Sequence, residues 1–376
     1  MIKNLFWITL LLSIMFLSSC GGDDNDSSSI TSSPSTSSSS TNQPSTTPTS
    51  SNSSSLSIGQ KLATSLHGTN RGMGYHYAKE QGGFEQFTHV AYQDLSCQGC
   101  HVQSNQCDAC HEKVGDKPTN DKCFACHKRQ QAEQMFSPDY HIIPVSSGGL
   151  GMQCRDCHSL AQIHGDGKEY NSLHQNPNKV DCQKSNCHTK LNEDKPMHKQ
   201  HHEDLDCAAC HVQVTPSCYG CHFTQQEGFA GNIVFQPPIA NWKLLVKSQK
   251  TGKITTGGLQ TVTSYQGQAF YSLAPYFAHT IPKESGLECG DCHNSSALRE
   301  YKAKGTMTLV TWDPLSKSLN SLSGIIPIPL DWKTALRMDF LTLEPSGEWI
   351  YLKNAADGSH MMFADPISVG TMPKFE

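Results

Sequence analysis

Seven times in this chain, two cysteines separated by two residues are followed at once by a histidine. On one turn of helix the positions i, i+3 and i+4 share a face, so the two thiols and the imidazole can reach one flat ligand. The thiols can add to the two vinyl groups of a porphyrin while the imidazole binds its iron, and this spacing is the attachment signature of c-type haem. The seven motifs are Cys97, Cys100 and His101; Cys107, Cys110 and His111; Cys123, Cys126 and His127; Cys154, Cys157 and His158; Cys207, Cys210 and His211; Cys218, Cys221 and His222; and Cys289, Cys292 and His293.

Two other roles of paired cysteines fit this pattern less well. Zinc sites also use cysteines at this spacing, but zinc does not need a histidine directly after every second cysteine. Disulfides, which are common in exported proteins, need no histidine at all. Seven histidines after seven pairs therefore favour haem attachment.

An eighth pair, Cys182 and Cys187, has four residues between its cysteines instead of two, and His188 follows it directly. Because the second cysteine and the histidine keep their usual relation, the pattern predicts a haem site with two residues looped out. A disulfide between Cys182 and Cys187 is the alternative, and it leaves His188 without a role. The sequence thus predicts eight covalently attached haems, with the eight motif histidines as proximal iron ligands.

The occupant of the second axial position of each iron separates an electron carrier from a catalyst. Of the 19 histidines, eight belong to the motifs and eleven do not, so a protein with bis-histidine haems has enough of them. The weaker candidates for distal ligands are His198, His201 and His360. Methionine sulfur is another axial ligand, and Met152, Met197 and Met361 are alternatives, although packing is the more common role of methionine. We expect the distal ligands to be His67, His76, His89, His141, His164, His174, His202 and His279.

The spacing of the motifs constrains the elements that position them. Seven haems attach within residues 97–222, which leaves too little chain to wrap each haem separately, so the porphyrins themselves must fill the interior. Short helices, turns and ligand loops are expected there. After residue 223, β-branched and aromatic runs separated by turn residues predict strands, and residues 331–340 predict a helix capped by Asp331. The predicted strands include residues 242–247, 261–264, 306–311 and 349–352.

The predicted fold is therefore an irregular, haem-packed multihaem core of short helices and loops, followed by a partly β C-terminal region. We place the multihaem domain with seven haems at residues 58–222 and the partly β region with the eighth haem at residues 223–376. That second region is expected to cover one flank of the haems. A docking or polymerisation surface is the alternative role.

The N-terminal residues predict export. Residues 1–19 contain Lys3, an apolar run and small residues before Cys20, which is the pattern of a secretory signal peptide. The ending Leu-Ser-Ser-Cys is typical of a lipoprotein signal, with Cys20 as the lipidated residue; an ordinary signal peptide with an incidental cysteine is the alternative. Gly21 after Cys20 favours the outer membrane, on its periplasmic or surface side. Residues 20–57, mostly Ser and Thr, predict an unstructured tether.

Charge restricts the partners. The chain has a formal net charge of -5, and bound haem propionates would make it more acidic. Nucleic-acid binding has no support, whereas redox partners with basic patches do.

With its motifs at residues 97–293, the chain resembles the multihaem c-type cytochromes, and specifically the octahaem group of outer-membrane lipoprotein type. It departs from pentahaem nitrite reductases, since no motif has Lys in place of the proximal histidine, and it is shorter than octahaem enzymes that oxidise hydroxylamine. The resemblance implies heme c as the cofactor and a histidine before a motif as a ligand to a neighbouring haem.

The function expected from these observations is electron transfer from respiratory donors toward an outer-membrane or extracellular acceptor through closely packed, mostly bis-histidine haems. The partners would be other cytochromes, quinol-linked redox proteins, an extracellular metal oxide, or further copies of the chain in a polymer. The alternative is a multihaem reductase of a small nitrogen or sulfur oxyanion, or a hydroxylamine-oxidising enzyme, with one open haem. A scaffold that only stores haem is a third, poorer interpretation. No residue is predicted to be catalytic.

Overall fold

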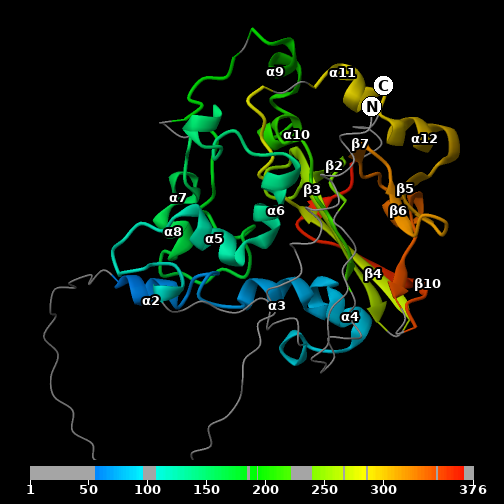
Figure 1. Ribbon diagram of the computed structural model, residues 1–376, viewed down its shortest axis with the longest axis horizontal. Coiled ribbons are helices and arrows are strands. Elements are labelled where there is room, and N and C mark those ends of the chain that lie inside the picture. Colours follow the sequence, from blue (N-terminus) through cyan, green and yellow to red (C-terminus); the bar gives the residue numbers. More distant parts are fainter. Residues whose placement is uncertain are drawn as a thin grey trace, which may run out of the picture. The chain divides into compact units, whose positions relative to one another are not determined.

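The computed structural model describes residues 56–95, 107–183, 187–192, 194–221, 239–265, 267–284, 287–343 and 346–367. Helices dominate before residue 212 and strands after residue 217 (Figure 1). The signal peptide, Cys20 and the tether lie outside the described residues, and so do all three residues of the first predicted motif, Cys97, Cys100 and His101. None of the described helices is long and apolar enough to cross a membrane.

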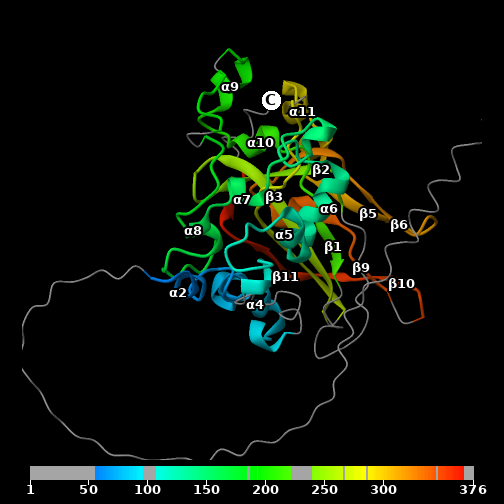
Figure 2. The same cartoon turned by 60° about the vertical axis from the view of Figure 1, so that its left-hand side comes forward.

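The helical part is built of short segments. Its longest helix, α6, has nine residues, and several helices coincide with motifs: α7, α10 and α11 each begin at the first cysteine of a motif. In Figures 1 and 2, α2 to α4 lie at one end of the sheet and α9 and α10 at the other. The helices are α2 (Ile58–Leu62), α3 (Arg71–Tyr77), α4 (Phe84–Thr88), α5 (Asn120–Cys126), α6 (Lys128–Phe136), α7 (Cys154–Cys157), α8 (Leu160–Ile163), α9 (Pro196–His201), α10 (Cys207–His211), α11 (Cys289–His293), α12 (Ser296–Lys304) and α13 (Trp332–Ala335), with single 3-10 turns at Lys79–Gln81, Tyr92–Asp94, Cys107–Ala109 and Val145–Ser147.

The principal sheet has the strand order β11-β4-β3-β2-β12, with β1 added to β3 and β7 added to β2. Strands β2, β3 and β4 are antiparallel neighbours, whereas β11 runs parallel to β4 and β7 parallel to β2. Its strands are β1 (Cys218–Cys221), β2 (Trp242–Ser248), β3 (Ile254–Tyr265), β4 (Gln268–Pro275), β7 (Gly324–Pro327), β11 (Lys353–Met361) and β12 (Ala364–Asp365). Two smaller sheets have the orders β6 (Ser318–Ser321), β5 (Met307–Asp313), β8 (Leu336–Met338) and β10 (Trp349–Tyr351), β9 (Leu341–Leu343).

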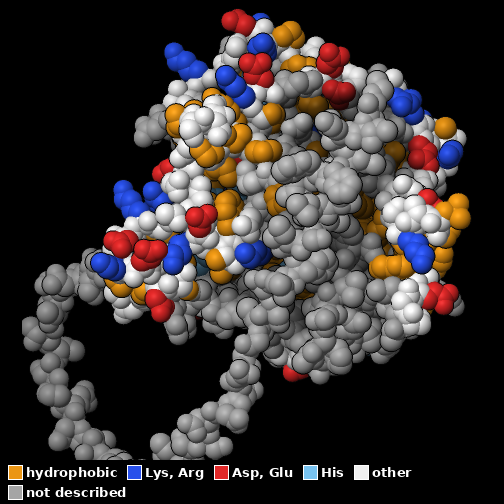
Figure 3. All heavy atoms as spheres, in the orientation of Figure 1, with side chains coloured by type: hydrophobic (Ala, Val, Ile, Leu, Met, Phe, Trp, Pro, Cys, Tyr) orange, Lys and Arg blue, Asp and Glu red, His pale blue; other side chains and the backbone are white. Residues whose placement is uncertain are grey.

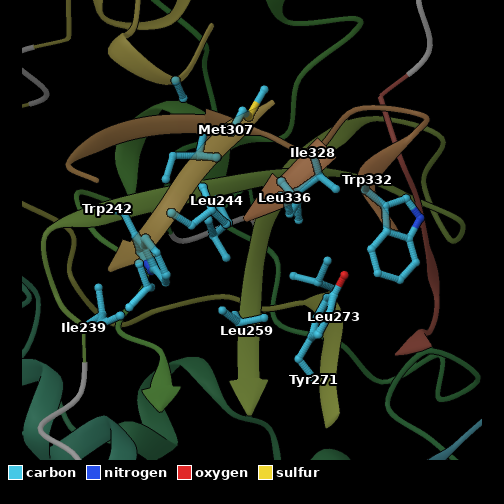
Figure 4. Close-up of a cluster of buried hydrophobic side chains, with 14 of the residues drawn as sticks. Ile239, Trp242, Leu244, Leu259, Tyr271, Leu273, Met307, Ile328, Trp332 and Leu336 are labelled. Atoms are coloured by element: carbon cyan, nitrogen blue, oxygen red, sulfur yellow. The ribbon is translucent and has the colours of Figure 1, made fainter. Parts of the chain in front are cut away.

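The β part has a hydrophobic core of its own. Trp242 and Leu244 of β2 pack with Leu259 of β3 and Tyr271 of β4, and Trp332 of α13 contributes from the side (Figure 4). Alternation along the strands puts these side chains on one face, and Leu245 and Ile254 on the other face belong to a second buried cluster, so the centre of the sheet is covered on both sides. The predicted partly β C-terminal region is therefore confirmed.

The predicted strands match β2, β3, β5 and β10 to within one residue at the ends of the last two, but the predicted helix at residues 331–340 is wrong beyond Ala335. The Asp331 carboxylate accepts a hydrogen bond from the Tyr301 hydroxyl at 2.7 Å and does not cap the helix. Leu336 then pairs in parallel with Met307 of β5. Pairing with β5 has overridden local helix propensity.

The segment that carries most of the motifs, residues 107–206, is not built around an apolar protein core, whereas Phe84 and Leu95 before it are buried in a small apolar cluster. Among the described residues 107–206, the buried side chains are all polar: Glu133, Asp139, Ser172 and Asn176. Large apolar side chains such as Val114 and Leu160 are 86% and 74% exposed. On the left of Figure 3, where this part lies, hydrophobic side chains are mixed with charged ones at the surface. The described residues after Ser55 nevertheless form one unit, and the predicted boundary near residue 222 falls in the stretch 222–238, outside them.

Candidate functional site

Six motif histidines each face a second histidine from elsewhere in the chain. The distance between the ring centroids is nearly constant, from 6.0 to 6.2 Å. The pairs are His111–His164 at 6.0 Å, His127–His67 at 6.1 Å, His158–His279 at 6.2 Å, His188–His141 at 6.1 Å, His211–His198 at 6.1 Å and His293–His201 at 6.1 Å.

The constant spacing fits a metal ion held between two imidazoles. Metal–imidazole bonds of about 2.0 Å on opposite sides of one ion place the two ring centroids about 6.3 Å apart. Direct ring packing has no reason to repeat one distance, and the interplanar angles indeed range from 19° to 89°. No group of three or more His, Cys, Asp or Glu in the described residues could hold a metal ion. A porphyrin supplies four nitrogens itself, so two axial histidines are the donor set that haem iron needs.

The backbone of the regular motifs closes in one way. The amide N–H of the histidine donates to the carbonyl of the first cysteine, at 2.8 Å for His111 and His127 and 2.9 Å for His158. In α7 and α11 an aspartate inside the motif strengthens the turn: Asp156 and Asp291 accept from the N–H of the residue before the first cysteine, at 2.7 and 2.8 Å. A carboxylate at this position satisfies a helix N-terminus.

The stretched motif closes in the same way. The amide of His188 donates to the carbonyl of Cys182 at 3.0 Å, although the loop between them is longer by two residues. The Cys182 thiol donates to the Cys207 sulfur, and both Cys182 and Cys187 are free thiols. The alternative disulfide between Cys182 and Cys187 is therefore wrong for this structure.

Cysteines of successive motifs lie next to one another. The Cys154 thiol donates to the Cys123 sulfur, which raises the pKa of Cys154 and lowers that of Cys123 to about 7. Cys182 likewise lowers the pKa of Cys207 to about 6. Beside burial and hydrogen bonding, electrostatic repulsion between the thiolate forms raises the pKa of Cys110, Cys182 and Cys292, and it also links Cys110 to Cys123, Cys157 to Cys182 and Cys210 to Cys292. The six described motifs that carry paired histidines thus form an unbroken row in the order of the sequence.

Burial keeps several of the paired imidazoles neutral. It lowers the pKa of His67 and His127, and neighbouring histidines lower both further. The same two causes act on His164, His211 and His293. A neutral imidazole is the form that binds a metal, so at neutral pH these rings are ready to ligate.

The other ring nitrogen of three paired histidines has a hydrogen-bond partner that fixes the ring orientation, and that of His279 faces a carboxylate at a longer distance. His111 and His198 direct Nδ1 to the backbone carbonyls of Asp116 and Asn192, at 2.6 and 2.8 Å. His141 is 2.8 Å from the Asp139 carboxylate, and His279 is 3.6 Å from the Glu133 carboxylate. Such outer contacts orient ligands and tune a bound metal.

The structure brings four of the expected distal ligands, His67, His141, His164 and His279, to motif histidines. It also brings two of the weaker candidates there, His198 and His201, which share α9. A signal in the sequence could have found them. Pro196 predicts a helix start, and both histidines on that helix precede Cys207 by a distance within the range of the other candidates, although this spacing does not exclude His202.

The remaining expected ligands have other neighbours among the described residues. His76 faces His360 at 5.1 Å, His174 stacks on Phe363 at 4.9 Å, and His202 forms an ion-pair contact with Glu203 at 3.2 Å. His89 is exposed, and its backbone adopts the left-handed conformation directly after the end of α4. Of the methionine alternatives, Met197 contacts the Cys289 sulfur at 3.8 Å. The backbone carbonyl of Met152 accepts a hydrogen bond from Asn120, and Met361 packs against the hydrophobic core of the β part.

Two motifs differ from the six that carry paired histidines. Cys218 and Cys221 lie in strand β1, which runs parallel to β3, so the expectation of a helical turn is wrong there. Their histidine, His222, lies outside the described residues. The predicted attachment of a haem to Cys97 and Cys100, with His101 as its proximal ligand, also falls outside them and stays a prediction.

Comparison with known proteins gives no match to a family model, a curated protein or a solved structure.

Proposed function

We propose that this chain is an octahaem c-type cytochrome of the outer membrane that transfers electrons along a row of bis-histidine haems. The observation that carries the proposal is the set of six histidine pairs at one spacing, each joining a motif histidine to a second ring. Haem, when bound, supplies reversible one-electron exchange at its iron. Cys20 and the Ser/Thr tether support a lipid anchor.

The packing of the helical part supports the same proposal. A segment of this length normally needs buried apolar side chains to be stable, because chain ordering is costly in entropy. Among the described residues 107–206, the buried side chains are polar, and the apolar ones lie at the surface or are half-buried. Eight porphyrins held between these loops would supply the missing apolar interior.

The row of motifs supports a continuous route for electrons. Each of the six motifs with paired histidines interacts electrostatically with the next through its cysteines, from Cys110 at one end to Cys292 at the other, and two of these links are thiol hydrogen bonds. The histidines on both sides of each site leave no axial position for a substrate at these six sites. This arrangement favours a carrier over a reductase, and it restricts an open haem to the sites of His101 and His222.

The direction of electron flow follows from the anchor. Respiratory donors, such as quinol-linked cytochromes, would deliver electrons on the membrane side, and the acceptor would be another cytochrome or an extracellular metal oxide. The acidic chain suits partners with basic surfaces.

The test is the low-temperature EPR spectrum of the fully oxidised protein, with haem counted by pyridine haemochrome on the same sample. The proposal expects eight haems, all low-spin. One high-spin haem would instead support the reductase, and nitrite, hydroxylamine and sulfite would then be assayed as substrates. If the chain is produced in a host that has the cytochrome c maturation system and the purified protein carries no covalent haem, the proposal is overturned.

A further inference from the structure

The distal histidine of the stretched motif has a partner unlike that of the other paired histidines. His141 Nδ1 lies 2.8 Å from Asp139 Oδ1, and its backbone N–H also donates to this oxygen at 2.9 Å. Asp139 is only 4% exposed. Among the described residues, it has no ion pair with Lys or Arg.

Glu133, the other carboxylate beside a paired histidine, is differently engaged. It accepts hydrogen bonds from the Tyr276 hydroxyl and from the His279 backbone N–H at 2.7 Å, and Arg129 lies 3.9 Å away. Its 3.6 Å separation from His279 Nδ1 is too long for a hydrogen bond. The charge of Glu133 is therefore shared among several groups, whereas that of Asp139 is directed at one imidazole.

A carboxylate that accepts the Nδ1 proton makes the opposite nitrogen a stronger electron donor to a metal. A buried negative charge close to the site also favours the more positive, oxidised iron, and burial limits the screening of that effect. Backbone carbonyls, which face His111 and His198, carry no net charge and exert a weaker version of the same effect.

We propose that Asp139 lowers the reduction potential of the haem held by Cys182, Cys187, His188 and His141, and makes it the most reducing of the six sites with paired histidines. This inference rests on the proposed function. The stretched site lies inside the row, between the motifs of Cys154 and Cys207. Electrons that pass along the row would therefore meet their highest-energy step there, and Asp139 would set the rate of through transfer.

The experiment is a potentiometric titration of the haem-loaded full chain and of Asp139→Asn, monitored by absorbance and EPR. Asp139→Asn keeps the shape and a hydrogen-bond acceptor but removes the charge. We expect the lowest-potential haem to become easier to reduce by about tenfold in its equilibrium constant, which is about 59 mV for one electron. Asp139→Glu, which keeps the charge, should retain a low potential.

Two controls locate the effect. Glu203→Gln removes a carboxylate from the exposed His202 contact and should leave every potential unchanged. In a Cys182→Ser/Cys187→Ser background that lacks the stretched site's haem, Asp139→Asn should have no effect on the remaining haems.

Eight low-spin haems in Asp139→Asn with unchanged potentials would overturn the role of Asp139 and leave the proposed function intact. A shift that persists in the Cys182→Ser/Cys187→Ser background would also overturn it, because another haem would then be the one affected. A native chain that binds no haem would overturn the proposed function itself, and this inference with it.

Discussion

The ring of His201 lies 6.1 Å from that of His293, whereas His202, the next residue, contacts Glu203 at the surface. This contrast between adjacent histidines gives a direct test of distal ligation. His201→Ala should open one axial position and convert one haem from low-spin to high-spin, while His202→Ala should leave the spectrum unchanged. EPR of both oxidised variants decides, and a high-spin haem in His202→Ala alone would contradict the pairing described here.

The stretched motif predicts a defined change in haem content. Because His188 closes on the Cys182 carbonyl as regular motifs do, Cys182→Ser/Cys187→Ser should lose one haem and keep the other seven. Intact-mass spectrometry of the purified protein measures this loss of one covalent haem mass. A mass that falls only by the two sulfur-to-oxygen replacements would mean that the stretched pair carries no haem, and the total would then be seven.

The buried pair His76 and His360 predicts a pH-dependent stability. Burial, and then the nearby His360, lower the pKa of His76 to about 4 in the folded protein, against about 6.5 when unfolded. Because the unfolded state binds the proton more tightly, this contribution is complete above pH 6.5 and is lost as the pH falls from 6.5 to about 4. The expected loss is about 3 kcal/mol in the free energy of unfolding.

Denaturant unfolding at pH 7, 5.5 and 4 measures this loss. In the control variant His76→Gln, the free energy of unfolding should depend less steeply on pH. Equal slopes for the two proteins would show that His76 does not titrate in this range. A new high-spin haem in His76→Gln at pH 7 would instead identify His76 as an axial ligand, as its sequence position suggested.

The β part should be stabilised by its apolar core independently of haem. Trp242 is fully buried, and its indole N–H donates to the Ser217 hydroxyl at 3.0 Å. Trp242→Ala should cost about 3 to 5 kcal/mol in the free energy of unfolding, through the cavity and the lost hydrogen bond. Leu315→Ala, at a 94% exposed position, should cost less than about 0.5 kcal/mol. Far-UV circular dichroism in denaturant compares them, and equal midpoints would contradict the core assignment.

A structural feature can be predicted from the sequence when the residues that determine it are close together along the chain. The motif spacing is local, and it predicts the short helices at Cys154, Cys207 and Cys289. Strands such as β2 follow from runs of apolar and β-branched residues. The helix expected at residues 331–340 fails because a strand partner, β5, is far away in sequence.

Pairing of ligands is not local, and this is why only half of the expected distal histidines face a motif histidine among the described residues. His67 and His127 or His158 and His279 meet only after the chain has folded. No spacing rule distinguishes His201 from His202, since the choice depends on which face of α9 turns toward α11. Asp139, by contrast, lies only two residues before His141 in the sequence, so this carboxylate could have been identified from the sequence as a partner of that histidine.

Four of the six paired histidines precede the motif that they face. In an exported chain, His67, His141, His198 and His201 would emerge before their partners, so a newly made motif would meet a second ligand that is already in place. The site of His158 is different, since His279 comes from far downstream, at the end of the β4 segment. If haem binds there as proposed, a chain cut short in the β part would carry an incompletely ligated iron, open to oxygen and peroxide. Under the proposed function, safe redox chemistry at this site would then depend on synthesis of the C-terminal region.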